Sequence, residues 1–429
     1  MKTFAHFRLP AHDAKNDFLI GLRGFFVIQS CFFVFLLVFA PNAVAFSPNA
    51  RSSTTTPHKA LKLFSILLWN KGNISTGFLI LSARTICIPF MTSGPGRRLS
   101  IAGSIFRRGI RVGVPVAVSL ALSTAILHVL GYQNIDDFAK RTGNVSIVIP
   151  YRIDTLLVYF NSVFNLFWTT DNFLDQAGSY GFPGQMMWVI SVIYQQSYTV
   201  YMTIIIIPYT RKTWRVKGAV LFILTAWWVQ SWAWFTISGL VLADMALNMN
   251  LKVKAQRGVR QIYHAVTIPS YFVYFALLAI GILMQYLSVW SSKHNNNVSI
   301  ANEAPYSASN FIERNNHERP IAQIDNYLVL LSLFLFVETS DLLQWILSNP
   351  VFVYFGKRSL SFFLVQPIVT YTLGIRVHEA LRTANNVILI AACFISTLFV
   401  SLVGSETFYR AVEVPSHTMA HAAFEWMQS

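Results

Sequence analysis

Charged residues are scarce in this sequence of 429 residues: Asp, Glu, Lys and Arg make up only 12% of it. Soluble domains carry about 25%. Hydrophobic residues account for 54%, and the mean hydropathy is +0.48. This composition excludes a soluble enzyme and predicts a protein that shares its apolar surface with lipid. A soluble protein of this length would form about two or three domains, whereas a polytopic membrane bundle forms a single domain.

Cysteines and the common catalytic motifs are also scarce or absent. The three cysteines, Cys31, Cys87 and Cys393, lie singly in apolar runs without metal-ligand spacing, so neither a disulfide framework nor a zinc site is indicated. The sequence has no GxSxG motif, no HExxH motif and no phosphate-binding glycine loop. Serine-triad hydrolysis, metal-assisted chemistry and hydride transfer therefore have no basis in the sequence.

Acidic residues are outnumbered by basic ones, and the formal net charge is +15. In a soluble protein this excess would suggest nucleic-acid binding. Here the Lys and Arg residues lie in short segments between apolar runs, where they determine membrane topology. The expected partners are therefore membrane lipid and a small-molecule or lipid substrate, and not a nucleic acid.

Apolar runs long enough to cross about 30 Å of hydrocarbon, at roughly 20 residues each, recur along the chain. They predict an all-α polytopic membrane bundle with ten transmembrane helices, at about 18–40, 74–92, 109–131, 186–208, 213–230, 232–248, 266–288, 325–345, 351–374 and 386–409. Residues 1–17 and 410–429 then form terminal segments that flank a transmembrane domain over 18–409. The junction from Trp227 to Trp234 is either a tight turn between two short spans or part of one helix that overruns the membrane.

Basic residues cluster between spans two and three, four and five, and six and seven, which the positive-inside rule places in the cytoplasm together with both termini. The N-x-Ser/Thr acceptors Asn73, Asn144 and Asn297 fall in segments on the opposite side. They predict a glycoprotein of the endoplasmic reticulum or another endomembrane. The first span, followed by the small residues 43–45, also resembles a signal peptide, whose cleavage would leave nine spans.

Charged residues within apolar spans cost about 2.5 to 3.5 kcal/mol each on insertion and by default face an interior cavity. Arg23, Arg84, Asp244, Glu338 and Asp341 all lie toward the predicted cytoplasmic side. Glu338 and Asp341 share a helix face and repel each other unless a cation or a proton intervenes, so Arg23 or Arg84 is the natural partner. These charges either form ion pairs that fix the bundle or line a vestibule open to the cytosol.

The fourth predicted span carries hydroxyl and amide groups near the middle of the bilayer. Ser191 and Gln195 share one helix face, with Trp188 one turn before them and Gln196 beside them. Lipid would leave such groups without hydrogen bonds, so they must bond to neighbouring helices or to a ligand. Both interpretations, polar helix packing and a polar substrate pocket, stay open.

Several short motifs follow one another along the chain: Gly21–Gly24, Phe78–Ser82, Phe106–Arg111 with Pro115, Trp188–Tyr201, Ser238–Asp244 and Tyr354–Gly374. In this order, and over nearly the whole chain, they resemble the acyltransferase-3 family and in particular its fungal branch. The resemblance implies a multipass transferase that moves an acyl group from cytosolic acyl-CoA, its co-substrate, to a hydroxyl of a small or lipidic acceptor. A role in fungal secondary metabolism would fit, and no bound cofactor is implied.

The resemblance also implies where the donor binds. Arg108 and Arg111 fit the family's arginine-x-x-arginine element, which is suited to phosphates that arrive from the cytosol. Together with the polar residues of the spans, this predicts a substrate site formed by Arg23, Arg84, Arg108, Arg111, Trp188, Ser191, Gln195 and Gln196.

Three positions of the family pattern hold residues that cannot shuttle protons at neutral pH: Val34, Ile193 and Gln366 stand where histidine, glutamate and histidine are expected. Acyl transfer to a hydroxyl needs a base and donors for the oxyanion. Burial would raise the pKa of a carboxyl group toward the range that a base requires. The predicted catalytic group is therefore Asp244, Glu338, Asp341 and Gln366, with the amide as a hydrogen-bond donor.

Two other classes of function compete with acyl transfer. One is an integral membrane terpene cyclase or isomerase, in which a buried carboxylic acid protonates an alkene and aromatic walls stabilise the cation. The other is a bundle without catalytic activity that binds or transports a lipid.

Overall fold

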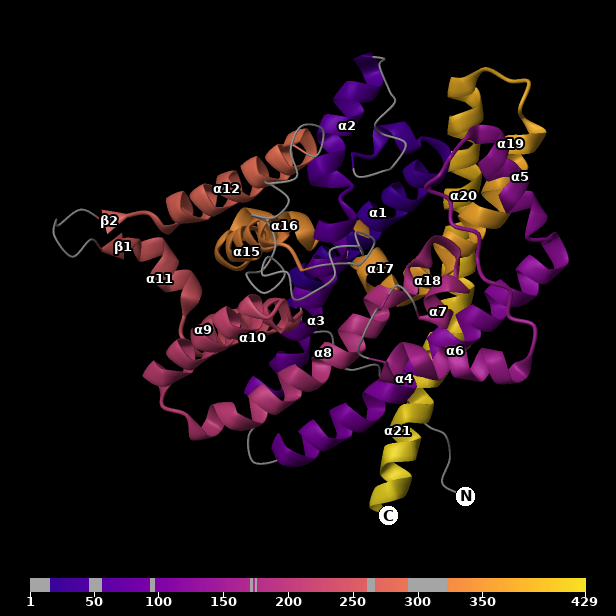
Figure 1. The fold of residues 1–429 in the computed structure, drawn as a ribbon. Helices are drawn as coiled ribbons and strands as arrows, with labels where there is room; N and C mark the ends of the chain where they lie inside the picture. The colour runs from indigo at the N-terminus through magenta and orange to yellow at the C-terminus, as the bar shows by residue number, and fades with distance from the viewer. Residues whose placement is uncertain are drawn as a thin grey trace.

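The structure is a computed structural model, which describes residues 16–45, 56–92, 97–169, 173, 176–260, 267–291 and 322–429. Over these ranges the chain is almost entirely helical (Figure 1). One antiparallel pair of two-residue strands occurs in them, β1 (Val259–Arg260) with β2 (Thr267–Ile268). The predicted all-α bundle is confirmed.

Long apolar helices make up most of the bundle. Within the described ranges, seven helical stretches are long and apolar enough to cross a membrane, or eight if one bent pair counts as a single span. The labelled helices in these seven are α1 (Asp17–Phe39), α2 (Thr56–Leu68) with α3 (Lys71–Thr92), α4 (Arg97–Leu130), α8 (Met187–Ile206), α12 (Ser270–Ser291), α18 (Ser359–Val369) with α19 (Ile375–Ala380), and α20 (Asn386–Phe408) with α21 (Val414–Gln428). The lengths indicate a membrane protein with several spans, although they do not confirm ten.

Two of the ten predicted spans are short helices. The helices α9 (Lys212–Trp228) and α10 (Ala233–Asn248) have 17 and 16 residues, fewer than the roughly 20 that a span needs. A tight turn joins them, in which Gln230 has a positive φ of 59°. Of the two interpretations of this junction, the turn between two short helices is therefore right.

Two further predicted spans are broken. The span predicted at 325–345 bends by 97° between α15 (Ile324–Thr339) and α16 (Asp341–Leu347). The hydroxyl of Ser340 accepts a hydrogen bond from the backbone nitrogen of Leu343, so it caps a new helix at the bend. The span predicted at 351–374 divides into α17 (Pro350–Lys357) and α18, which continues through the π-helical turn η6 (Thr370–Gly374) into α19.

Short elements fill the connections. They are η2 (Pro41–Ala43), α5 (Gln133–Thr142), α6 (Leu156–Trp168), α7 (Ala177–Tyr180), η4 (Pro183–Gln185), η5 (Ile207–Tyr209) and α11 (Leu251–Arg257). Of these, α6 packs against α4, α7 and α8, with Ser162 and Leu166 buried and Phe160 and Phe164 exposed.

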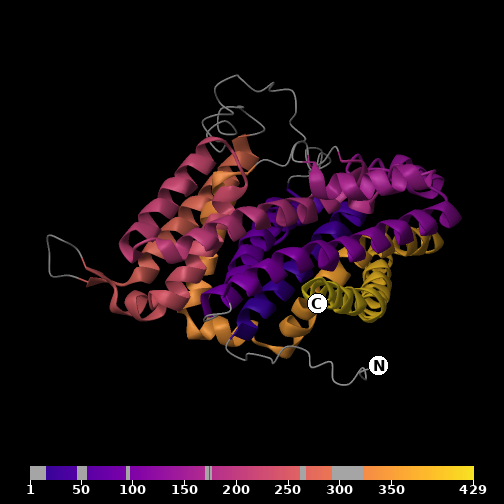
Figure 2. The same cartoon turned by 90° about the horizontal axis from the view of Figure 1, so that it is seen from below.

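The last residues form a helix that belongs to the bundle. The helix α20 continues through the π-helical turn η7 (Tyr409–Glu413) into α21, and α21 packs along α4. In Figure 1 this yellow helix runs down to the C-terminus beside α4. Figure 2 shows that the indigo helices separate this yellow helix from the helices α9, α10, α11 and α12. Residues 410–429, predicted as a terminal segment, thus form one wall of the bundle.

Glycines let α1 approach its neighbours closely. A Cβ atom at Gly21 would lie 1.6 Å from the carbonyl oxygen of Leu347, and one at Gly24 would lie 1.9 Å from that of Phe352. Such backbone contacts between helices require residues without side chains. Since α1 also contacts α3 and α18, it is a central helix, and its cleavage as a signal peptide would leave a gap between these neighbours.

Two of the predicted glycosylation sites are buried. The Asn73 amide is 6% exposed and accepts a hydrogen bond from Gln285 at 2.9 Å. The Asn144 amide is 3% exposed and donates to the carbonyl oxygens of Leu37 and Val38. Neither side chain is exposed enough to carry a glycan in the folded structure, so these two positions give the predicted glycoprotein no support. Asn297 lies outside the described residues, and the predicted orientation therefore depends on the basic segments.

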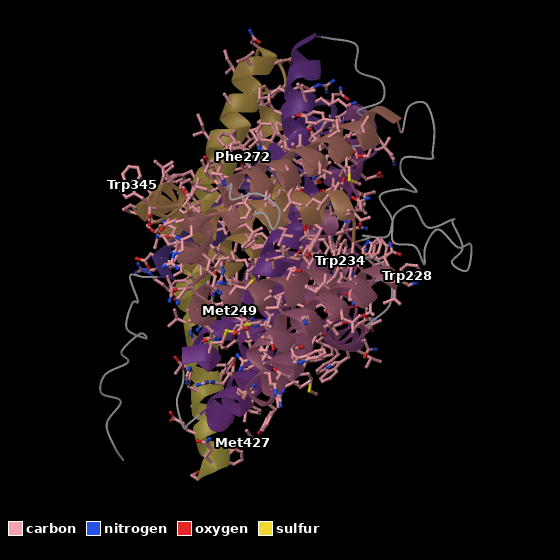
Figure 3. All side chains as sticks on the ribbon, turned by 90° about the vertical axis from the view of Figure 1, so that its left-hand side faces the viewer. Trp228, Trp234, Met249, Phe272, Trp345 and Met427 are labelled. Atoms are coloured by element: carbon pink, nitrogen blue, oxygen red, sulfur yellow. The ribbon has the colours of Figure 1, made fainter. Side chains whose placement is uncertain are left out.

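Exposed tryptophans mark two sides of the bundle. Trp345 on α16 and Trp228 on α9 are 77% and 58% exposed, and Figure 3 shows them on opposite sides of the molecule. Tryptophans are enriched at both membrane interfaces. Their placement therefore agrees with a bundle that spans a bilayer.

Candidate functional site

A cavity of about 500 Å³ lies between α1, α3, α4, α8, the junction of α17 with α18, and α21. Small-molecule sites have volumes of roughly 300 to 1,000 Å³. The charged and titratable side chains that line the cavity, among the described residues, are Arg23, Arg108, Arg111, Tyr201, Lys357, Glu413 and His417. The remaining lining combines hydroxyl groups of α3 and α4 with apolar side chains of α3, α8 and α18.

Two arginines inside the cavity are held by hydroxyl groups of α3. Arg23 donates from Nη2 to Thr85 Oγ1 at 3.3 Å, and Arg108 donates from Nη2 to Ser82 Oγ at 3.2 Å. Arg108 also donates to the carbonyl oxygen of Ile193 at 3.3 Å, while its Nε is buried without a hydrogen-bond partner. These guanidinium groups are fixed by neutral acceptors. Within the described ranges neither forms an ion pair with a carboxylate, although Glu413 is close enough to attract Arg23.

The C-terminal helix supplies histidines that are not among the predicted site residues. Arg111 Nε donates to His417 Nε2 at 3.3 Å, and Arg107 Nη1 lies 2.8 Å from His421 Nδ1. Arginine can only donate, so the contacting nitrogen of each imidazole is an acceptor and the ring is neutral. The sequence did contain a signal, because Arg107 and Arg111 have the same spacing of four residues as His417 and His421.

Glu413 is the carboxylate of the cavity. It is buried, and it accepts a hydrogen bond from Ser361 Oγ at 2.5 Å. The other charged groups that line the cavity are Arg23, Arg108, Arg111 and Lys357. This excess of positive charge within one cavity is costly unless an anion enters. The cavity is therefore suited to an anionic group.

The predicted catalytic carboxylates lie elsewhere, which corrects the expectation of one shared pocket. Glu338 and Arg84 form a buried ion pair of their own, with 2.7 Å between Oε1 and Nε. Asp244 lies 3.6 Å from Arg215 and accepts from Asn248 at 2.6 Å. Asp341 pairs with Lys252 and is largely exposed, because the chain bends just before it. These three carboxylates thus form ion pairs outside the cavity lining.

The predicted polar groups of α8 and Gln366 serve helix packing. Ser191 donates to the carbonyl oxygen of Leu166, and Gln195 donates to that of Thr169, so both residues join α8 to α6 and the segment after it. Gln366 donates to Thr370 Oγ1 at 3.0 Å within its own helix. The residues of α8 that line the cavity are instead Val189, Ile190, Ile193 and Tyr201.

Two more residues of the predicted substrate site lie outside the cavity lining. Trp188 packs on Trp232, with ring centroids 6.0 Å apart, and Lys71 Nζ lies 5.8 Å from the Trp188 ring. Gln196 accepts from Thr199 at 3.4 Å. Of the predicted substrate site, the structure thus brings together Arg23, Arg108 and Arg111.

Comparisons with known proteins add no family to these observations. No family model, no curated protein and no solved structure matches the chain. Among the described residues, no three His, Cys, Asp or Glu side chains gather closely enough to hold a metal ion.

Proposed function

We propose that this protein is a membrane-embedded acyltransferase, in an endomembrane such as the endoplasmic reticulum, that holds acyl-CoA in the cavity. The observation that carries this proposal is the convergence of Arg23, Arg108 and Arg111 on one cavity. Arginine is well suited to phosphate groups, which CoA carries. The apolar part of the lining suits an acyl chain, and the motifs that resemble the acyltransferase-3 family agree with this donor.

The residues of the cavity can divide the chemistry between them. Lys357 and Arg111 are exposed at the cavity and would bind the phosphates. Arg23 and Arg108 are half-buried and would donate to the carbonyl oxygen as it becomes an oxyanion. Among the described residues that line the cavity, His417 carries an imidazole group. It is the proposed general base.

The proposed reaction balances its protons through His417. The acceptor hydroxyl attacks the thioester carbonyl carbon while His417 Nε2 takes the hydroxyl proton. The tetrahedral intermediate then collapses, the carbon–sulfur bond breaks, and the proton passes to the departing CoA thiolate. In the structure Arg111 Nε donates a hydrogen bond to His417 Nε2 at 3.3 Å. Binding of Arg111 to a phosphate would free this nitrogen to accept the proton of the hydroxyl.

We expect Arg111→Ala to raise the Kd for acyl-CoA about 10- to 100-fold, since hydrogen bonds to charged groups such as phosphates contribute about 1.5 to 3 kcal/mol. The measurement is titration of the purified protein in lipid nanodiscs. Arg410→Ala is the matched control, because Arg410 is exposed and pairs with Glu406 away from the cavity. Equal loss of affinity in both variants would show that general positive charge, and not the cavity, attracts the donor.

His417→Ala separates catalysis from binding. We expect it to abolish release of free CoA in the presence of a lipid extract that supplies acceptor alcohols, while donor binding stays close to wild type. Binding without CoA release in the wild type, with every acceptor tested, would contradict the transferase and leave a protein that only binds an anionic lipid or metabolite.

The cyclase alternative has less support from the cavity. Its acid would have to be Glu413, the carboxylate of the lining among the described residues. The facing arginines would repel a carbocation, because like charges in a low-dielectric site are strongly unfavourable. The same cationic groups favour an anionic donor.

A further inference from the structure

The cavity changes from polar to apolar along its length. On α8, Tyr201 follows Val189 by twelve residues, which corresponds to about 18 Å of helix. On α3, Thr85 follows Phe78 by seven residues, or about 10 Å. Arg23 contacts Thr85, whereas Arg108 contacts Ser82 and Ile193, which follow Phe78 and Val189 by four residues, or about 6 Å of helix. The guanidinium groups therefore lie one to two helical turns from the end formed by Phe78 and Val189.

Three side chains close the apolar end of the cavity. Phe78 from α3 and Phe363 from α18 meet edge to face, with ring centroids 6.0 Å apart. Val189 from α8 lines the same end, and it is 3% exposed. Phe78 is supported from behind by the fully buried Phe26, at 5.7 Å between ring centroids. We call Phe78, Val189 and Phe363 the aromatic floor.

A second void lies beyond the aromatic floor. It shares Phe78, Val189 and Phe363 with the first cavity and is otherwise lined by Phe33, Lys71, Ile74, Ser75 and Met186. Its free space is too small for a water molecule. Protein interiors are packed as densely as organic crystals, so a chain that reaches the floor meets closely packed side chains with no space behind them.

Building on the proposed function, we infer that the aromatic floor limits the length of the acyl chain, so that the donor carries a short acyl group. Phe363 is the specificity-determining residue, because its ring closes the floor and separates the two voids. Removal of the ring would open the volume that the ring itself fills and admit a longer chain. Each methylene that overfills an apolar pocket lowers the affinity of the ligand by about tenfold or more.

The test compares acetyl-, butanoyl-, octanoyl- and dodecanoyl-CoA on the full chain in nanodiscs. In the wild type we expect the affinity to fall by at least about tenfold once the chain reaches the floor. Phe363→Ala should recover at least that factor for octanoyl-CoA while leaving acetyl-CoA nearly unchanged, and Phe363→Trp should restrict binding to acetyl-CoA. Phe362→Ala is the matched control, since Phe362 is buried on the same helix but packs on Phe355, away from the cavity.

The outcomes separate this inference from the proposed function. Equal affinity for all chain lengths in the wild type and in Phe363→Ala would overturn the length limit and leave acyl-CoA binding intact. The same change of profile in Phe362→Ala would also overturn it, because the effect would then be general loosening of α18. Failure of every acyl-CoA to bind, acetyl-CoA included, would overturn the proposed function itself. If Phe363→Ala does not fold, Phe363→Leu keeps the test in place with a smaller opening.

Discussion

At the scale of single residues, the Arg84–Glu338 pair shows how a buried charge can serve structure alone. Both side chains are 5% exposed or less. Removal of one partner leaves an uncompensated charge in the interior, which costs about 3 to 5 kcal/mol. We therefore expect Glu338→Ala to lower the midpoint of thermal unfolding in detergent strongly, as followed by tryptophan fluorescence.

The double variant Arg84→Met with Glu338→Leu is the informative control. Replacing both charges by apolar groups of similar size should restore most of the lost stability, and acyl-CoA binding should stay unchanged because the pair lies outside the cavity lining. By contrast, Asp341→Ala should change stability by about 1 kcal/mol or less, since its pair with Lys252 is exposed. A double variant as unstable as Glu338→Ala would contradict this account.

The sequence predicted which residues carry buried charge better than it predicted their partners. Arg23, Arg108 and Arg111 were selected for the site, and they do meet. The carboxylates were expected to join them. Glu338 does meet Arg84, one of its two expected partners, across 254 positions of sequence, but this pair lies outside the cavity lining. Asp244 and Asp341 pair instead with Arg215 and Lys252. Spacing along a helix gives the face on which a residue lies, but the partner depends on which helices become neighbours, and local patterns do not encode that.

At the scale of helices, α21 completes the cavity by docking on α4. An added Cβ atom at Gly103 would lie 2.8 Å from the ring of Phe424, which also stacks on Arg107 at 5.7 Å. We expect Gly103→Leu to push α21 away from α4 and to weaken acyl-CoA binding, because the cavity would lose the wall that α21 forms around the donor. Hydrogen–deuterium exchange of residues 414–428 should rise in this variant.

Gly218→Leu is the matched control for this helix. Gly218 lies on α9 and has no heavy atom within 4 Å of an added Cβ, so the same substitution should leave both exchange and binding unchanged. Increased exchange in α21 without any loss of affinity would contradict its place in the site.

The same helix shows where sequence reasoning about elements stopped short. The last apolar run ends near residue 409, and the polar composition beyond it favours a terminal segment. Instead the backbone passes through η7 without breaking, so α21 continues the helix and returns Glu413 and His417 to the bundle. A π-helical turn shifts the face that a helix presents, and the apolar periodicity before it does not predict the contacts after it.

At the scale of the whole molecule, orientation decides whether a cytosolic donor can reach the cavity. The polar lining of the cavity lies near the start of α4 and the end of α8. The exposed residue Thr213, at the start of α9, lies on the same side of the bundle as the end of α8. The three native cysteines are buried, so background labelling of thiols should be low. In intact microsomes, we expect a membrane-impermeant maleimide to label Thr213→Cys directly and Val145→Cys, which is 75% exposed beyond the other end of α4, only after detergent is added. The reverse pattern would turn the cavity toward the lumen, where cytosolic acyl-CoA has no access, and would contradict both the positive-inside prediction and the proposed donor.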